Sequence, residues 1–265
     1  MMPAPVTLID TARVAYMPPD GALHGPAIDF LMRWNLIALL VCFAVAHLWL
    51  IVAVLKRRKA PTPKLQSERQ NTGRLQKVLR VALLGALCAM YVWMAITAQR
   101  LWAANRFEGP SLEAMQVEVV GQQFQWYFRY PGRDAVFGAT QAEFANAAAG
   151  NPLGIDARDA RGTDDVVSSV LVLPAGREVD LRLRSLDVIH GFFIPGMRLK
   201  ENAVPGLLLH VHFTPEVPGI YPILCSQVCG LGHARMEAQL RVVSPTEYEA
   251  WMDAHERALA NRGGQ

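Results

Sequence analysis

Residues 36–55 read LIALLVCFAVAHLWLIVAVL, a stretch in which His47 is the one strongly polar side chain. At about 1.5 Å per residue, a helix of this length crosses the roughly 30 Å hydrocarbon core of a membrane. Residues 81–98, VALLGALCAMYVWMAITA, form a second uncharged run, which is just long enough to do the same. Core helices of soluble proteins rarely stay uncharged on every face over such lengths. The sequence therefore predicts two transmembrane helices, at about residues 31–55 and 79–102.

The linker between the two apolar runs is strongly basic. Residues 56–80 carry nine Lys and Arg against a single acid, Glu68. Because an excess of Lys and Arg marks the cytoplasmic side, we expect a multi-pass protein of the inner or plasma membrane with both termini outside. The first 25 residues contain one Arg and no apolar run of their own, so no separate cleavable signal is expected there.

Charge divides the chain into two parts. Residues 1–102 hold 12 basic and 4 acidic side chains, and residues 103–265 hold 14 and 19. We interpret the first part as an N-terminal segment with the helix hairpin and the second as an extracytoplasmic domain. Charge bears on partners rather than on fold, and a mildly acidic domain suits a basic partner. Nucleic acid is not among the expected partners.

The second part has the pattern of an all-β domain. In residues 179–184, Val179, Leu181 and Leu183 alternate with charged residues, which is typical of a strand with one buried face. Other short runs with this period, separated by Gly and Pro, lie at 115–121, 124–130, 170–173, 207–213, 220–224 and 238–243. Many short strands of this kind predict a sandwich or barrel. Residues 133–166 interrupt them and are expected to form a long exposed excursion. Ser244 and Glu247 make a capping box that predicts a C-terminal helix.

Residues 225–236, CSQVCGLGHARM, contain the most specific pattern in the chain. Two thiols, an imidazole and a thioether fall within this short segment, and such soft donors suit copper. A single blue-copper site uses one Cys, whereas two thiolates can bridge two copper ions. Two ions require a second imidazole from elsewhere in the fold. His190, in the apolar segment DVIHGFF of residues 187–193, is the candidate.

Other interpretations of these residues remain open at this point. A Cys2His2 zinc site would be closed and would give Met236 no role. An oxidising outer compartment would favour a disulfide between Cys225 and Cys229. His210 and His212 share one face of a strand and could chelate a metal, although such a pair is more often a polar strand face.

The 225–236 segment resembles the copper A loop of cytochrome c oxidase subunit II, a subunit of the haem-copper oxidases. The resemblance extends to the helix hairpin, the aromatic strand at residues 121–127, the strand with His190 and the terminal helix. It implies a cupredoxin-like sandwich that holds a binuclear copper A centre and works with oxidase subunit I, other oxidase subunits and cytochrome c. The implied ligands are the side chains of His190, Cys225, Cys229, His233 and Met236 and the backbone carbonyl of Gln227.

Three departures from the family pattern affect other expected roles. Gln227 stands where the family usually has Glu, and a neutral amide is a poorer ligand for the magnesium that the family holds beside subunit I. Phe124 aligns with the Trp at which electrons enter, and Trp126 matches the second Trp, so both are candidates for electron input. Asp187, three residues before His190, is a candidate contact for the electron donor. The family often has a Glu at the start of the second helix, near a proton entrance. Residues 69–80 contain no Glu, so we assign no proton role to them.

The resemblance implies a subunit that accepts electrons from cytochrome c and passes them to haem in subunit I, where oxygen is reduced to water. We expect no oxygen chemistry in this chain, because it has no C-x-x-C-H motif and no cluster of intramembrane His. The copper A subunit of a nitric oxide reductase is the nearest alternative. A membrane-anchored copper-binding assembly protein is an alternative of another class. Quinol oxidase relatives lack the copper ligands, which are all present here.

Overall fold

A computed structural model of the chain describes residues 17–59 and 73–263. The chain forms two compact units. One unit is Ala27–Ala104, and the other holds the described residues of Met1–Pro26 together with those of Asn105–Gln265. The expectation for the first 25 residues falls mostly on residues 1–16, and that for the basic linker falls largely on residues 60–72. Both of these ranges lie outside the described residues.

Two long helices form the first unit. Helix α1 is Gly25–Lys59 and helix α2 is Arg74–Arg106, each longer than the apolar run at its centre. Both are long and apolar enough to cross a membrane, and no residue in the most apolar part of either is buried within the described chain. Leu39 and Trp49 on α1, for example, are each about two-thirds exposed. Such apolar surfaces require a nonpolar environment outside the chain, which confirms the helical membrane part of the predicted fold.

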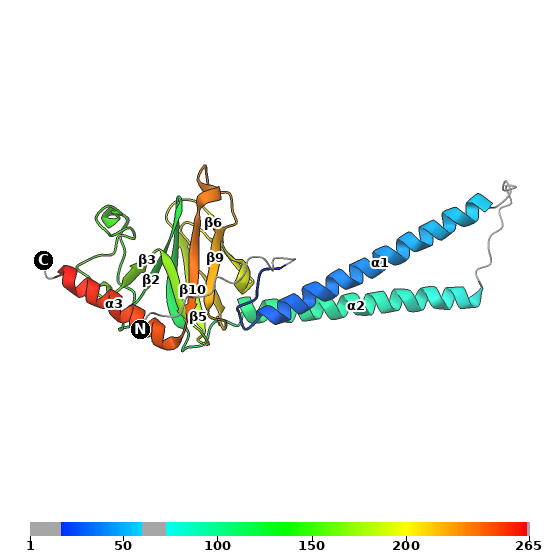
Figure 1. The fold of residues 1–265 in the computed structure, drawn as a ribbon, viewed down its shortest axis with the longest axis horizontal. Coiled ribbons are helices and arrows are strands. Elements are labelled where there is room, and N and C mark those ends of the chain that lie inside the picture. The colour runs from blue at the N-terminus through cyan, green and yellow to red at the C-terminus, as the bar shows by residue number, and fades with distance from the viewer. Residues whose placement is uncertain (1–16, 60–72, 264–265) are drawn as a thin grey trace. The chain divides into compact units, whose positions relative to one another are not determined.

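The second unit is built around a β-sandwich of two five-stranded sheets (Figure 1). The first sheet has the order β3-β2-β1-β5-β8 and the second β4-β10-β9-β6-β7. The strands are β1 (Met115–Gln122), β2 (Gln125–Tyr130), β3 (Val166–Ser168), β4 (Val170–Pro174), β5 (Val179–Ser185), β6 (His190–Ile194), β7 (Leu199–Ala203), β8 (Leu209–Phe213), β9 (Gly219–Cys225) and β10 (Glu237–Val243). Together with the two helices, they confirm the predicted cupredoxin-like fold class.

Alternating apolar side chains fill the space between the sheets. Val179, Leu181 and Leu183 of β5 are fully buried, as their period of two predicts. Trp126 and Phe128 of β2 meet Phe192 of β6 edge to face, with ring centroids 5.2 and 6.3 Å from that of Phe192. These rings join the two sheets directly beneath the strand end that carries His190.

The C-terminal helix α3 (Pro245–Gly263) begins as the sequence predicts. The Ser244 N–H donates to Glu247 Oε2 at 3.0 Å, and the Glu247 N–H donates to Ser244 Oγ at 3.3 Å, which completes the capping box. Tyr248 and Met252 are buried, and the Trp251 ring lies 4.9 Å from that of Tyr130. The helix therefore packs against the sandwich through one apolar face.

The long excursion between β2 and β3 is anchored by a buried arginine. Arg129 is 2% exposed, and its guanidinium donates to Asp165 Oδ2 and to the carbonyl of Gly138. Its third partner is Glu118, at 3.3 Å. Most of the excursion is exposed, and this ion-pair network fixes both of its ends to the outer face of the first sheet.

Candidate metal centre

Two neighbouring strands bring the predicted ligands to one end of the sandwich. Strand β6 begins at His190, and strand β9 ends at Cys225. The two strands are antiparallel, with Phe192 opposite Cys225, so these two ligand candidates lie at the same edge. The loop of residues 226–236, hereafter the ligand loop, returns to β10 by way of a short 3-10 turn. The Cys225 N–H donates to the Met236 carbonyl at 3.1 Å.

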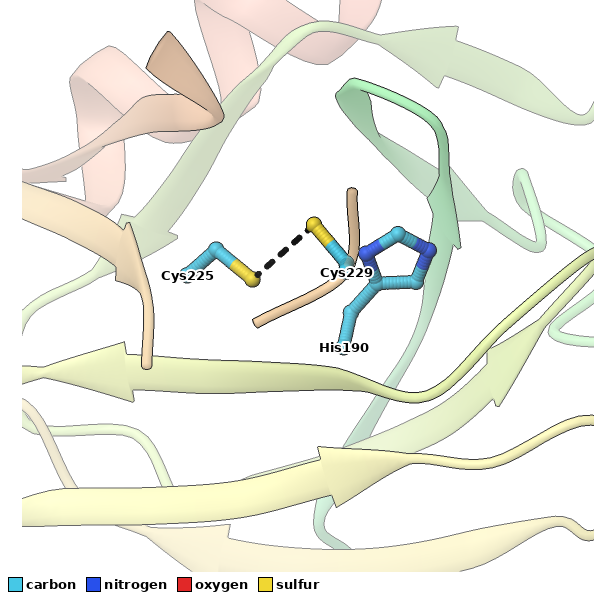
Figure 2. A group of neighbouring side chains, drawn as sticks. All are labelled: His190, Cys225 and Cys229. Carbon is cyan, nitrogen blue, oxygen red and sulfur yellow. Dashed lines mark hydrogen bonds between the residues drawn. The ribbon is translucent and has the colours of Figure 1, made fainter. Parts of the chain in front are cut away.

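The sulfur and nitrogen atoms of the predicted site converge. Figure 2 shows His190, Cys225 and Cys229 turned toward one another, and one donor atom from each lies within 4.8 Å of the others. The two thiol sulfurs are 3.8 Å apart. Cys229 Sγ is also 3.8 Å from His233 Nδ1 and 3.8 Å from Met236 Sδ.

The remaining predicted ligand, the Gln227 carbonyl, lies 3.2 Å from Cys225 Sγ. The structure thus brings all six predicted residues together. Both cysteines are free thiols, and their separation is far greater than the roughly 2.05 Å of a disulfide.

His190 has the environment of a metal-binding imidazole. It is fully buried, and its Nε2 lies 2.8 Å from Asp187 Oδ1. A carboxylate only accepts, so Nε2 is the donor, and in the neutral imidazole Nδ1 then keeps its lone pair. This Nδ1 is buried and has no hydrogen-bond partner in the described part of the chain. A buried polar atom left unpaired costs about 1–3 kcal/mol, and a metal ion would satisfy it.

The donor set suits two soft metal ions. Two thiols, two imidazoles and a thioether are the ligand types that copper favours, and the Met236 side chain is buried beside Cys229. Burial, together with the hydrogen bond and charge of Cys225, raises the pKa of the Cys229 thiol from 9.0 to about 11. Binding of a metal at this thiol therefore releases a proton at neutral pH.

Glycines allow the ligand segments to approach one another closely. A Cβ on Gly121 of β1 would lie 2.9 Å from Cδ2 of His190. A Cβ on Gly191 of β6 would lie 2.3 Å from Ser226 Oγ and 2.8 Å from the Gln227 nitrogen. Neither glycine was among the residues predicted to be functional. The sequence signal at both positions is a glycine inside a strand, which marks a close approach of backbone to another group.

The two aromatic candidates for electron input occupy different environments. Trp126 is fully buried, and its ring meets that of His190 edge to face at 5.8 Å. Phe124 is 38% exposed, and a Cβ on Gly232 of the ligand loop would lie 2.4 Å from its ring. Trp126 is therefore a core residue beneath the site. Phe124 belongs to the turn between β1 and β2 and packs against the ligand loop at the surface.

His210 and His212 lie on β8, apart from the converging ligands. His210 Nδ1 is 2.8 Å from Asp180 Oδ2, and His212 Nδ1 is 3.1 Å from Glu178 Oε1. Both carboxylates come from β5 or the residue before it, on the outer face of the first sheet. The two imidazoles are thus engaged in cross-strand pairs.

Comparison with known proteins gives consistent matches. The family described as "Cytochrome C oxidase subunit II, periplasmic domain" matches residues 115–243. The alternative cytochrome c oxidase subunit 2 of Bradyrhizobium diazoefficiens is 35% identical over 173 residues, which are 64% of this chain and 61% of that protein. Cytochrome c oxidase subunit 2 of Cereibacter sphaeroides is 29% identical over 157 residues, 56% of this chain and 52% of that protein.

The chain thus spans between about half and three fifths of the length of these two relatives. A crystal structure of the periplasmic domain of cytochrome oxidase subunit II from Bradyrhizobium japonicum is 23% identical. It covers 57% of this chain and 99% of its own length, with a TM-score of 0.43.

Proposed function

We propose that the chain, whose residues 115–243 match the cytochrome c oxidase subunit II family, is the electron-accepting subunit of a terminal oxidase. The proposed donor is cytochrome c, and the proposed acceptor is haem in subunit I, where oxygen is reduced to water. When bound, a binuclear copper A centre supplies one-electron transfer between them. This chain's part is to hold that centre outside the membrane and to present it to both partners.

In this proposal the thiolates of Cys225 and Cys229 and the imidazoles of His190 and His233 would hold two copper ions. The Met236 thioether and the Gln227 carbonyl would add weaker ligands. The observation that carries the proposal is the buried Nδ1 of His190, which has no hydrogen-bond partner among the described residues and lies beside two free thiols 3.8 Å apart. The burial of Met236 at 3.8 Å from Cys229 Sγ favours copper over a closed Cys2His2 zinc site, which does not use a thioether.

The fold supports electron transfer by limiting movement at the site. His190 and Cys225 are strand residues, and Met236 directly precedes β10. Ligands mounted on paired strands have little freedom to shift when the charge of the centre changes. A site that rearranges little when its charge changes can transfer electrons fast. The site of a copper carrier, in contrast, has to open, so this rigidity favours an electron-transfer subunit.

An apolar surface on the ligand loop is the proposed docking site for the donor. Val228 and Leu231 are 77% and 107% exposed, and the exposed part of Phe124 lies beside the same loop. The excess of acidic side chains in residues 103–265 would attract a donor with a basic face. Asp187 stays a predicted contact for the donor. Its carboxylate also accepts hydrogen bonds from His190 and from the Gln123 and Val188 N–H groups.

Stopped-flow reduction of the copper-loaded full chain by reduced cytochrome c tests this function. We expect reduction of the copper centre at a rate that falls as ionic strength rises, because salt screens complementary charge. The Cys225→Ser, Cys229→Ser double variant is the control and accepts no electron. A copper-loaded chain that cytochrome c does not reduce would refute the proposed donor, and a rate that is flat or rises with salt would refute steering by the acidic surface.

A further inference from the structure

We propose that Gln123 is a positioning residue that clamps the ligand loop to the His190 side of the metal centre. The inference rests on the proposed function, since it concerns the geometry of that same site. Gln123 lies in the turn between β1 and β2, which carries none of the predicted copper ligands. Its two polar groups nevertheless join both of the segments that do.

Hydrogen bonds run through Gln123 from one predicted ligand to another. Its side-chain Nε2 donates to the carbonyl of Cys229 at 2.7 Å. Its backbone N–H donates to Asp187 Oδ2 at 2.6 Å, and Asp187 Oδ1 in turn accepts from His190 Nε2. Three hydrogen bonds therefore link the Cys229 backbone to the His190 ring across two sheets of the sandwich.

The same turn also packs directly on the ligand loop. A Cβ on Gly230 would lie 2.9 Å from Gln123 Nε2 and 3.1 Å from the Phe124 ring, and one on Gly232 would lie 2.4 Å from that ring. Gly230 has a φ of 138°, a backbone conformation that side chains other than glycine rarely adopt. The loop backbone is thus shaped to receive the Gln123 amide and the Phe124 ring.

Cys229 is the residue whose placement matters most for the site. Its sulfur lies 3.8 Å from donor atoms of Cys225, His233 and Met236, so a shift of its backbone disturbs three of the converging contacts. The Gln123 amide holds the carbonyl of this same residue. A loop that is held in place before the metal binds loses less conformational freedom on binding, which strengthens metal retention.

The test uses the full-length chain in detergent with the variant Gln123→Met, which keeps the length of the side chain and removes the donor. Gln123→Glu places an acceptor against the Cys229 carbonyl and serves as a second variant. The matched control is Gln125→Met, because Gln125 is an exposed amide two residues away and makes no hydrogen bond with the ligand loop in the described structure.

The first measurement is the alkylation rate of Cys229 in the metal-free chain, read by mass spectrometry with Cys42 and Cys88 as internal references. The second is copper retention against a chelator, with the EPR spectrum of the loaded chain.

We expect Gln123→Met to raise the alkylation rate and lower copper retention by about fivefold, the factor that matches roughly 1 kcal/mol for one hydrogen bond. The EPR hyperfine pattern shifts, and Gln123→Glu gives a larger effect than Gln123→Met. The control behaves as the wild type. Wild-type values for Gln123→Met, or equal effects in the control, would overturn the positioning role. A wild-type chain that does not bind two coppers would refute the proposed function instead, while alkylation of the metal-free chain still reports on the clamp.

Discussion

The carboxylate of Asp187 accepts a hydrogen bond from Nε2 of His190 at 2.8 Å, and this contact determines which ring nitrogen faces the two cysteines. Metal-binding histidines commonly donate their second ring N–H to a carboxylate, which fixes the tautomer and the orientation of the ring. The pair also explains how a fully buried imidazole keeps one lone pair free. The residue suggested from sequence as a donor contact therefore has a supporting position behind a proposed ligand.

Replacing Asp187 by Ala should weaken copper binding without unfolding the domain. Partners of this kind typically contribute 10- to 100-fold to metal affinity, and we expect a loss within that range for Asp187→Ala. Copper titration of the full chain in competition with a chelator measures it. The matched control is Glu178→Ala, which removes the carboxylate that pairs with His212 on β8, away from the metal centre. Equal copper affinity in wild type and Asp187→Ala would show that the hydrogen bond to His190 has no role in metal binding.

Replacing Gly121 by Ala should displace the His190 ring. The added methyl group would lie 2.9 Å from His190 Cδ2 and 3.1 Å from the buried Trp126 ring, so one of these rings has to move. We expect copper retention to fall at least tenfold, with a smaller loss of thermal stability. Gly85→Ala is the control, because a Cβ at Gly85 of α2 meets nothing within 4 Å. Copper retention at the wild-type level in Gly121→Ala would contradict this close packing.

Copper binding should depend on pH through Cys229. The raised pKa, about 11, means that the folded protein favours the protonated thiol. The stability that this preference contributes is complete below pH 9 and is lost as the pH rises through about 11. Because copper binds the thiolate, we expect each loaded chain to release a proton from Cys229 and the apparent affinity to rise between pH 6 and pH 8. Titration in weakly buffered solution measures the protons released, with Cys229→Ser as control. An affinity that stays constant over this pH range would contradict the assignment.

Membrane topology should follow from the basic linker. Nine Lys and Arg in residues 56–80 predict that this linker is cytoplasmic and that both termini lie outside. Reporter fusions at residue 65 and at the C terminus should therefore report opposite sides of the membrane. If both fusions report the same side, the two helices do not form a spanning hairpin.

Much of the sandwich could be predicted from the alternation of side chains. The predicted runs at 115–121 and 179–183 correspond to β1 and β5. They could be recognised because apolar side chains recur at their inward positions. Strand β7, Leu199–Ala203, was missed because its central residues are Lys, Glu and Asn, so no period of two is visible. The predicted strand at 207–213 begins only at Leu209, and Leu207 and Leu208 are exposed after the turn at Gly206.

The site was predictable where its residues are close in sequence. Residues 225–236 fall in one loop, so their chemistry alone indicated a metal centre. His190 was a candidate from its apolar segment and from the resemblance to a family, but its position beside the loop could not be predicted from local sequence, because the pairing of β6 with β9 is a tertiary contact. No local pattern marks Gln123 as a partner of the Cys229 carbonyl. Such contacts depend on how a turn packs on a loop from the other sheet, and sequence periodicity carries no information about that.

The copper content of the full-length chain is the most direct test of the central claim. After loading with copper and removal of excess metal, elemental analysis should give two copper ions per chain. The EPR spectrum should show one unpaired electron shared by both ions, and His190→Ala should lose this signal. One copper ion, a bound zinc ion, or a blue-copper spectrum in the properly folded chain would contradict a binuclear centre.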